Sequence, residues 1–139
     1  MTEKILVPVD GSVNSGKGLK YACWLATRVG AQITVVHVVD VPYTGESAVL
    51  HVDSLIAAGK KILKEAKKIV EAEGCTSVVF ELRQGKGNSG HEIITFCKEG
   101  GFSMIVMSAT GHTALSHLLL GSVSDMVVHY APCPVVIVR

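Results

Sequence analysis

Short apolar runs alternate with amphipathic stretches along the whole chain, and this alternation is what most restricts the possible fold. The runs have the length and composition of strands, and the stretches between them carry apolar residues at helical spacing. The predicted strands cover residues 4–9, 33–39, 77–83, 102–107 and 135–138, and the predicted helices cover 15–29, 53–73, 91–99 and 121–130. Because such connections join parallel strands through right-handed crossovers, the sequence predicts a doubly wound α/β fold.

Single residues mark where the predicted helices begin and end. Gly30 and Gly74 follow the last apolar positions of two helices and are expected to stop them. Asp53 is the expected N-cap of the long helix, which leaves residues 40–52 as the longest irregular segment. No internal repeat or linker interrupts the pattern, so we expect one domain over residues 1–139.

Composition narrows the classes of protein. The chain has 139 residues, 48% of them hydrophobic and 18% charged, which is typical of a globular protein. Its formal net charge of +1 lacks the basic excess expected of a nucleic-acid-binding protein. No apolar run approaches the roughly 18 residues of a membrane span, and no signal peptide is recognisable. These features predict a cytoplasmic protein without membrane or nucleic-acid partners.

Four cysteines are scattered through the chain without any CxxC pair. They are Cys23, Cys75, Cys97 and Cys133. In a reducing compartment such residues are interpreted as small buried apolar side chains rather than as a metal or redox site.

The stretch 104–124 has the pattern of an anion-binding loop. An apolar strand is followed by Ser108-Ala109-Thr110-Gly111, and nine residues later Gly121-Ser122 opens a helix. A helix N-terminus offers unpaired N–H groups and partial positive charge, and glycine lets the main chain approach a bound group. We therefore predict that this loop holds the phosphates of a nucleotide.

Other polar groups should meet this loop at one edge of the sheet. Ligands of open α/β sheets bind beyond the carboxyl ends of the strands, where the strand order reverses. Asp10 follows the first strand and could accept hydrogen bonds from a ribose, and main-chain groups around Val38 could recognise a base. The simpler alternatives are that Asp10 is a turn or cap residue and that Gly111 and Gly121 serve turn geometry alone.

Two further patterns are weaker. Gly85–Gly90 reads GxGxxG, but it does not follow the first strand and lacks the acidic residue expected about 20 positions later, so a turn with Ser89 as the helix cap is favoured. His112 and His117 could act as acid or base or touch a γ-phosphate, although exposed loop histidines are commoner. The sequence contains no P-loop, nucleophile elbow or HExxH motif.

Five segments of this chain, in order and spacing, resemble those of a single-domain universal stress protein. They read KILVPVDGS, TVVHVVD, MIVMSATG, LLLGSVSD and HYAPCPVVIV. The motif of ATP-binding family members is G-x2-G-x9-G-[ST]. Gly111, Gly121 and Ser122 match it, whereas Ser108 replaces its first glycine. We expect this serine to weaken or retain nucleotide binding rather than to abolish it.

The resemblance implies a three-layer α/β/α fold of the adenine nucleotide α-hydrolase-like, Rossmann-like type, with a five-stranded parallel sheet of order 3-2-1-4-5. It also implies a homodimer that binds ATP, or ADP or AMP, with Mg²⁺ or Mn²⁺ on the phosphates. The positions implied to contact the nucleotide are Pro8, Val9, Asp10, Val38, Met107, Ser108, Gly111, His112, Gly121, Ser122, Val123 and Ser124.

The last strand gives a separate physical reason to expect the homodimer. In this strand order, residues 135–138 form an edge strand without an internal charge or proline to prevent pairing. Antiparallel pairing with a second copy would satisfy that edge, and a covering helix or loop is the alternative.

Three functions are compatible with this sequence. The first is an ATP-binding sensor or regulator of stress or energy status. The second is a slow ATP hydrolase or switch that uses the loop histidines. The third is a partner-binding stress protein without nucleotide, if Ser108 closes the site.

Overall fold

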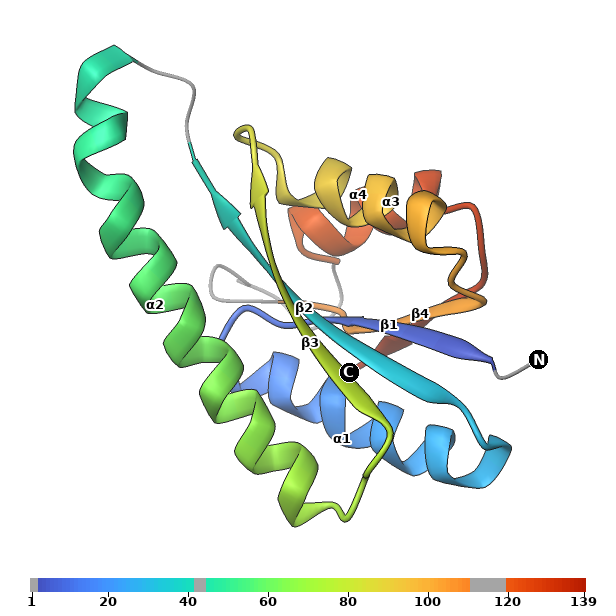
Figure 1. The fold of residues 1–139 in the computed structure, drawn as a ribbon. Helices are drawn as coiled ribbons and strands as arrows, with labels where there is room; N and C mark the ends of the chain where they lie inside the picture. Colours follow the sequence, from blue (N-terminus) through green and yellow to red (C-terminus); the bar gives the residue numbers. More distant parts are fainter. Residues whose placement is uncertain (1–2, 42–44, 111–119) are drawn as a thin grey trace.

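The computed structural model describes residues 3–41, 45–110 and 120–139, with the side chains of residues 45–50 left undescribed. Strands and helices alternate along the described chain, as predicted (Figure 1). The strands are β1 (Lys4–Pro8), β2 (Gln32–Asp40), β3 (Val78–Gly85), β4 (Met104–Ser108) and β5 (Val135–Val138). The helices are α1 (Val13–Val29), α2 (Gly45–Ala72), α3 (Ser89–Gly100) and α4 (Ser122–Tyr130).

The five strands form one parallel sheet in the order β3-β2-β1-β4-β5. Helices α1 and α2 cover one face of the sheet, and α3 and α4 cover the other (Figure 1). This arrangement confirms the three-layer fold and the strand order. The order reverses direction between β1 and β4, so the carboxyl ends of these strands lie beside a natural binding crevice.

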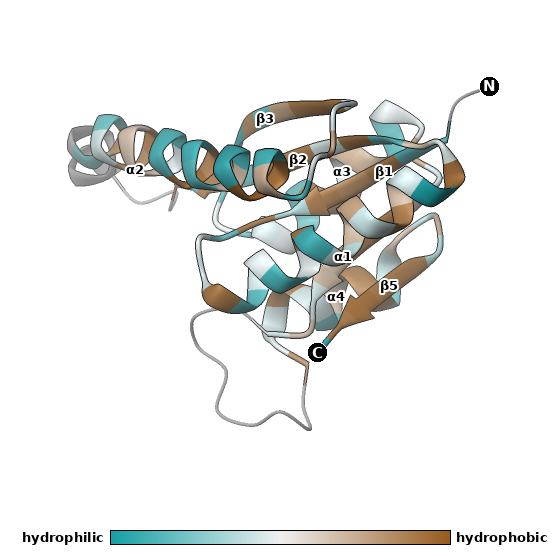
Figure 2. Cartoon of the chain, turned by 90° about the horizontal axis from the view of Figure 1, so that it is seen from below, coloured by the Kyte–Doolittle hydropathy of each residue, from teal (hydrophilic) through white to brown (hydrophobic). Residues whose placement is uncertain are grey.

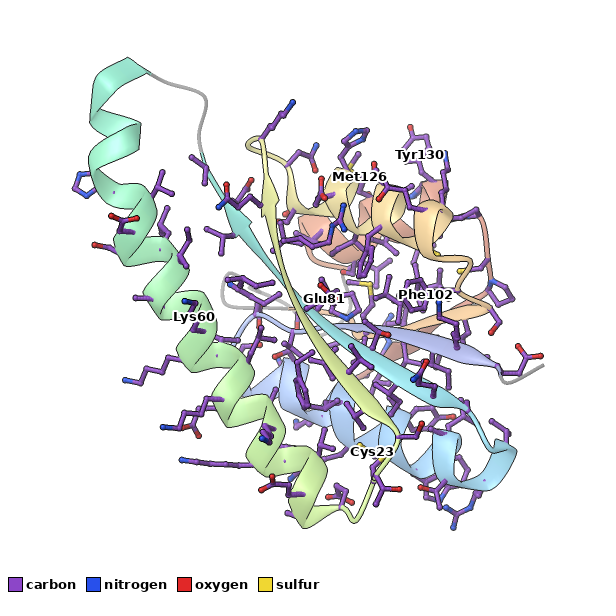
Figure 3. The ribbon with its side chains drawn as sticks, in the orientation of Figure 1. Cys23, Lys60, Glu81, Phe102, Met126 and Tyr130 are labelled. Atoms are coloured by element: carbon purple, nitrogen blue, oxygen red, sulfur yellow. The ribbon has the colours of Figure 1, made fainter. Side chains whose placement is uncertain are left out.

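Each face of the sheet carries its own hydrophobic core. Leu19, Ala22 and Val35 belong to the core under α1 and α2, whereas Leu6 and Ile105 belong to the core under α3 and α4. Figure 3 shows the two sides, with Cys23 on the α1 side and with Phe102 and Met126 on the opposite side. Because both faces are covered, the central strands need continuous apolar sequence rather than alternation.

The beginning of α2 differs from the prediction. The helix starts at Gly45, and Asp53 lies inside it instead of capping it. The sequence between them, GESAVLHV, contains no proline or internal glycine, so nothing interrupts the helix before it reaches Gly45. Residues 45–52, which were expected to be irregular, are therefore helical. The first turns of α2 extend beyond the sheet (Figures 1 and 2).

Strand β5 lies at an edge of the sheet, as the strand order requires (Figure 2). The N–H groups of Ile105 and Ala109 donate to the carbonyl oxygens of Pro134 and Val138, at 3.0 and 2.9 Å. Successive residues of a strand direct their N–H and C=O groups to opposite sides, so the residues between Pro134 and Val138 alternate in direction. The N–H of Ile137 therefore faces away from β4, toward the open edge.

Among the residues that the structure describes, no helix is long and apolar enough to cross a membrane.

Candidate functional site

A cavity of about 250 Å³ opens at the carboxyl ends of β1, β2 and β4. It brings together every predicted contact residue that the structure describes. The lining residues are Pro8, Val9, Asp10, Ser15, Val36, His37, Val38, Ser89, Ile93, Met107, Ser108, Thr110, Gly121, Ser122, Val123 and Ser124. Gly111, His112 and His117 lie outside the described residues.

The turn after β1 places Asp10 at the cavity. Gly11 has a φ of 85°, a left-handed conformation that glycine adopts at little cost, and the chain reverses there into α1. The Asp10 carboxylate accepts hydrogen bonds from the Ser12 N–H at 2.9 Å and from the Ser12 hydroxyl. Asp10 is thus a turn residue, as the simpler alternative held, and it also lines the cavity. Because a carboxylate can accept several hydrogen bonds, the two roles are compatible.

Hydrogen bonds fix the end of β1 against β2. The Val9 N–H donates to the Val36 carbonyl at 2.8 Å, and the Val9 carbonyl accepts from Nδ1 of His37 at 2.8 Å. The carbonyl can only accept, so Nδ1 carries the proton in this pair. These bonds hold Val9 and Val38 on the same wall of the cavity, where they offer apolar surface to a flat ligand.

Three hydrogen bonds fix the residues at the two ends of the loop after β4. The buried Ser108 donates from Oγ to the Thr110 carbonyl at 2.9 Å, and Nδ2 of Asn14 donates to the Thr110 hydroxyl at 2.9 Å. At the far end of the loop, the Gly121 N–H donates to the Ala109 carbonyl at 2.8 Å. This last bond brings the two ends of the loop together, so the start of α4 lies beside the end of β4.

Ser124 supports this closure rather than projecting its hydroxyl hydrogen into the cavity. Its Oγ donates to the carbonyl of Ala109 and also lies 3.0 Å from the carbonyl of Gly121. The side chain is buried, with an exposed fraction of 3%. Among the groups of Ser124, only its main-chain N–H remains a candidate donor to a ligand at this helix start.

The start of α4 differs from the starts of α1 and α3. Ser12 caps α1 by accepting from the Ser15 N–H, and Asn88 caps α3 by accepting from the His91 N–H. Gly121 occupies the same position in α4 and has no side chain with which to cap it. The first N–H groups of α4, from Ser122 to Ser124, therefore face the cavity region with the positive end of the helix dipole.

The backbone does not require glycine at position 121. Its φ of −67° and ψ of 165° are accessible to any residue. A Cβ built there would lie 3.6 Å from both the Ala109 oxygen and the Thr110 Cα, which is ordinary van der Waals contact. The fold alone therefore does not explain this glycine, whereas close approach of a ligand to the main chain would.

Comparison with known proteins identifies the family. The model of the universal stress protein family matches residues 1–139. This chain belongs to that family. A universal stress protein of Methanocaldococcus jannaschii is 35% identical over 99% of this chain and 82% of its own length. The universal stress protein YxiE of Bacillus subtilis is 34% identical over the full length of both chains.

Solved universal stress proteins share the fold. The protein UspA from Lactobacillus plantarum superposes with a TM-score of 0.86 at 26% identity, covering 99% of this chain and 97% of that one. The protein from Archaeoglobus fulgidus was solved in complex with dAMP and superposes with a TM-score of 0.76 at 23% identity, covering 100% of this chain and 98% of that one. Another was solved with cAMP and has a TM-score of 0.77 at 23% identity, covering 99% and 97%. Adenine nucleotides thus occur in several proteins of this fold.

Ser108 is where this chain departs from the ATP-binding motif of the universal stress protein family. Its hydroxyl hydrogen is used within the loop, by the bond to Thr110. The serine lines the cavity, with an exposed fraction of 8%, and the cavity remains open beside it.

Helix α3 contributes residues that the sequence analysis missed. Ser89 and Ile93 line the cavity, and Asn88 rather than Ser89 is the helix cap. The Asn88 side chain reaches back to the His91 N–H, which is the usual geometry for asparagine at this position. Ser15, Val36, His37 and Thr110 were missed as well. Each lies within a few residues of a predicted position, and that proximity was the only available signal.

Within the part of the chain that the structure describes, no group of three or more His, Cys, Asp or Glu side chains could hold a metal ion.

Proposed function

We propose that this protein binds an adenine nucleotide in the cavity, with ATP in its Mg²⁺ or Mn²⁺ form as the physiological ligand. We further propose that it acts as a cytoplasmic homodimer that reports stress or energy status. Membership of the universal stress protein family supports the proposal, and so does the presence of AMP-type nucleotides in proteins of the same fold.

One observation carries the proposal: an uncapped helix N-terminus and a carboxylate line the same small cavity. The N–H groups at the start of α4 suit phosphate oxygens, and Asp10 suits the hydroxyl groups of a ribose. Apolar side chains, Val9, Val38 and Ile93, line the space left for the base. A single ligand with apolar, polyol and anionic parts matches these three kinds of surface.

The size of the cavity favours a mononucleotide. Its volume of about 250 Å³ is just below the range of about 300–1,000 Å³ for typical small-molecule sites. A divalent cation would be held mainly by the phosphates and water, as Mg²⁺ commonly is, and it would neutralise their charge.

The homodimer is proposed to form through β5. The strand lies at the edge of the sheet, and the N–H of Ile137 faces away from β4. Two antiparallel copies of such a strand can exchange main-chain hydrogen bonds about a two-fold axis. Its four residues, VVIV, contain no charge that would disfavour this pairing.

The test begins with the protein as purified. Native mass spectrometry of this sample should detect a bound adenine nucleotide. Extensive dialysis should then remove the nucleotide and leave the protein ready for titration. Calorimetric titration of the dialysed protein with ATP·Mg²⁺ should then show saturable binding, with GTP·Mg²⁺ as the matched control for the base. Absence of heat with ATP, ADP and AMP alike would reject the proposal and favour a partner-binding protein without nucleotide.

A further inference from the structure

Two cysteines that are distant in sequence meet on the side of the sheet covered by α3 and α4. Cys97 and Cys133 are 36 positions apart, and their Sγ atoms are 3.3 Å apart. The sequence analysis treated the four cysteines as unrelated apolar residues because no CxxC spacing joins them. Tertiary packing nevertheless brings two of these free thiols into contact, which spacing along the chain does not indicate.

The two partners differ in secondary structure and in access to solvent. Cys97 is buried in α3, and its carbonyl accepts from the N–H groups of Gly101 and Phe102 at the end of the helix. Cys133 is only partly buried, in a bend between Pro132 and Pro134 that joins α4 to β5. Cys97 is therefore held in place, whereas Cys133 lies in irregular backbone that solvent can reach.

We propose that Cys97 and Cys133 form a reversible disulfide when the protein meets a hydroperoxide. A disulfide has an S–S length of about 2.05 Å, so the sulfurs must approach by roughly 1.3 Å. Cys133 lies outside the helices and strands, so a shift of its side chain would break no helix or strand. The two sulfurs are thus already in contact before any oxidant arrives.

The chemistry assigns a different role to each sulfur. Burial, followed by the hydrogen bond with Cys133, raises the pKa of the Cys97 thiol to about 12. Cys97 therefore stays protonated, and Cys133, which solvent can reach, is the cysteine that meets the peroxide first. Its sulfur attacks one peroxide oxygen, the O–O bond breaks, and the leaving oxygen takes a proton to become an alcohol, or water in the case of hydrogen peroxide.

The second step closes the bond. As the Cys97 sulfur attacks the sulfenic acid formed on Cys133, its proton passes to the sulfenic oxygen, the S–S bond forms, and the S–O bond breaks. The thiol proton of Cys97 leaves with the departing hydroxide as water. Two thiols have then lost two electrons and two protons to one peroxide, and a small dithiol reverses the change.

The disulfide would link the two helices beside the cavity. It joins the far part of α3 to the bend that follows α4, and the opposite ends of these helices contribute Ser89 and Ser122 to the cavity wall. The closed ring contains β4, the loop after it and α4. Oxidation would therefore restrict the relative movement of two walls of the same cavity.

Peptide mapping tests the proposal directly. Trypsin should release residues 87–98 and 99–139, which contain Cys97 and Cys133 and no other cysteine. After hydrogen peroxide and alkylation, these two peptides should appear linked, with the mass of two hydrogen atoms lost, and dithiothreitol should separate them. The melting temperature of the oxidised protein should rise by roughly 5–10 °C.

Variants and alternative products complete the experiment. Cys97→Ala and Cys133→Ala should each abolish the linked peptide and the rise in melting temperature, whereas Cys23→Ala should retain both. An unlinked Cys133 oxidised to sulfinic or sulfonic acid, or a disulfide between two copies of the chain, would overturn the proposal. The mapping uses no nucleotide, so its result is independent of the proposed nucleotide binding.

Discussion

Replacing Gly121 with valine should weaken ATP binding while preserving the fold. The added Cβ would lie 3.6 Å from the Ala109 oxygen, which is ordinary van der Waals contact, so the protein has room for it. The two γ-methyl groups of valine would then occupy space beside the first N–H groups of α4, where a phosphate is proposed to lie. The substitution thus acts on the ligand more than on the protein.

The structure sets the size of the effect. A hydrogen bond to a charged group contributes about 1.5–3 kcal/mol, so losing one phosphate contact should weaken binding ~10–150-fold. The loss of stability should be smaller, about 1 kcal/mol, which is the typical cost of replacing a favoured N-cap residue by an apolar one. Gly121→Ala should fall between wild type and Gly121→Val in affinity.

Calorimetry with two ligands isolates the phosphate contribution. Gly121→Val should lose affinity for ATP·Mg²⁺ but bind adenosine as wild type does, because adenosine has no phosphate to displace. Gly16→Ala on α1 is the matched control, since Gly16 does not line the cavity. Unchanged ATP affinity in Gly121→Val would refute the reasoning, and an equal loss for ATP and adenosine would point to a distorted cavity instead.

Three further predictions follow from packing, titration and the sheet edge. Ile105→Ala, at a residue with 0% exposure, should lower the free energy of unfolding measured in urea by about 2–5 kcal/mol. Val79→Ala, at a residue with 41% exposure, should lower it far less, and equal losses would contradict the packing described. Burial raises the pKa of Cys23 and Cys97 from 9.0 to about 12, so the reduced folded state holds these protons more tightly and its free energy of unfolding should fall as pH rises from 9 toward 12. Cys97→Ala should show a shallower fall in the same urea titrations, and an identical slope would oppose that assignment. Ile137→Pro removes the N–H that faces the open edge and should convert a dimer to a monomer in light scattering, whereas an intact dimer would exclude pairing through β5.

Much of the fold could be predicted because local sequence and buried faces agree. The strands β1 and β4 are nearly continuous apolar runs and β2 is rich in β-branched residues, as suits a sheet covered on both faces. Helix starts were less predictable because several residues could serve as caps. Asp53 and Ser89 both looked suitable, yet α2 continues back to Gly45 and Asn88 caps α3.

The candidate site could likewise be predicted from the sequence only in part. Asp10, Val38 and Gly121 could be named in advance because each stands directly after or within a recognisable strand or at a helix start. Ser89 and Ile93 could not, because nothing local shows that the start of α3 reaches the cavity.

The sequence by itself determined the alternation of elements, the parallel sheet and the family, since these depend on hydrophobic period and short motifs. Only the tertiary structure decided which distant groups meet. Cys97 with Cys133, and Asn14 with Thr110, are brought together by packing between elements, and no spacing along the chain encodes these contacts. Contacts between elements depend on how whole faces fit, so they become visible only when the layers are assembled.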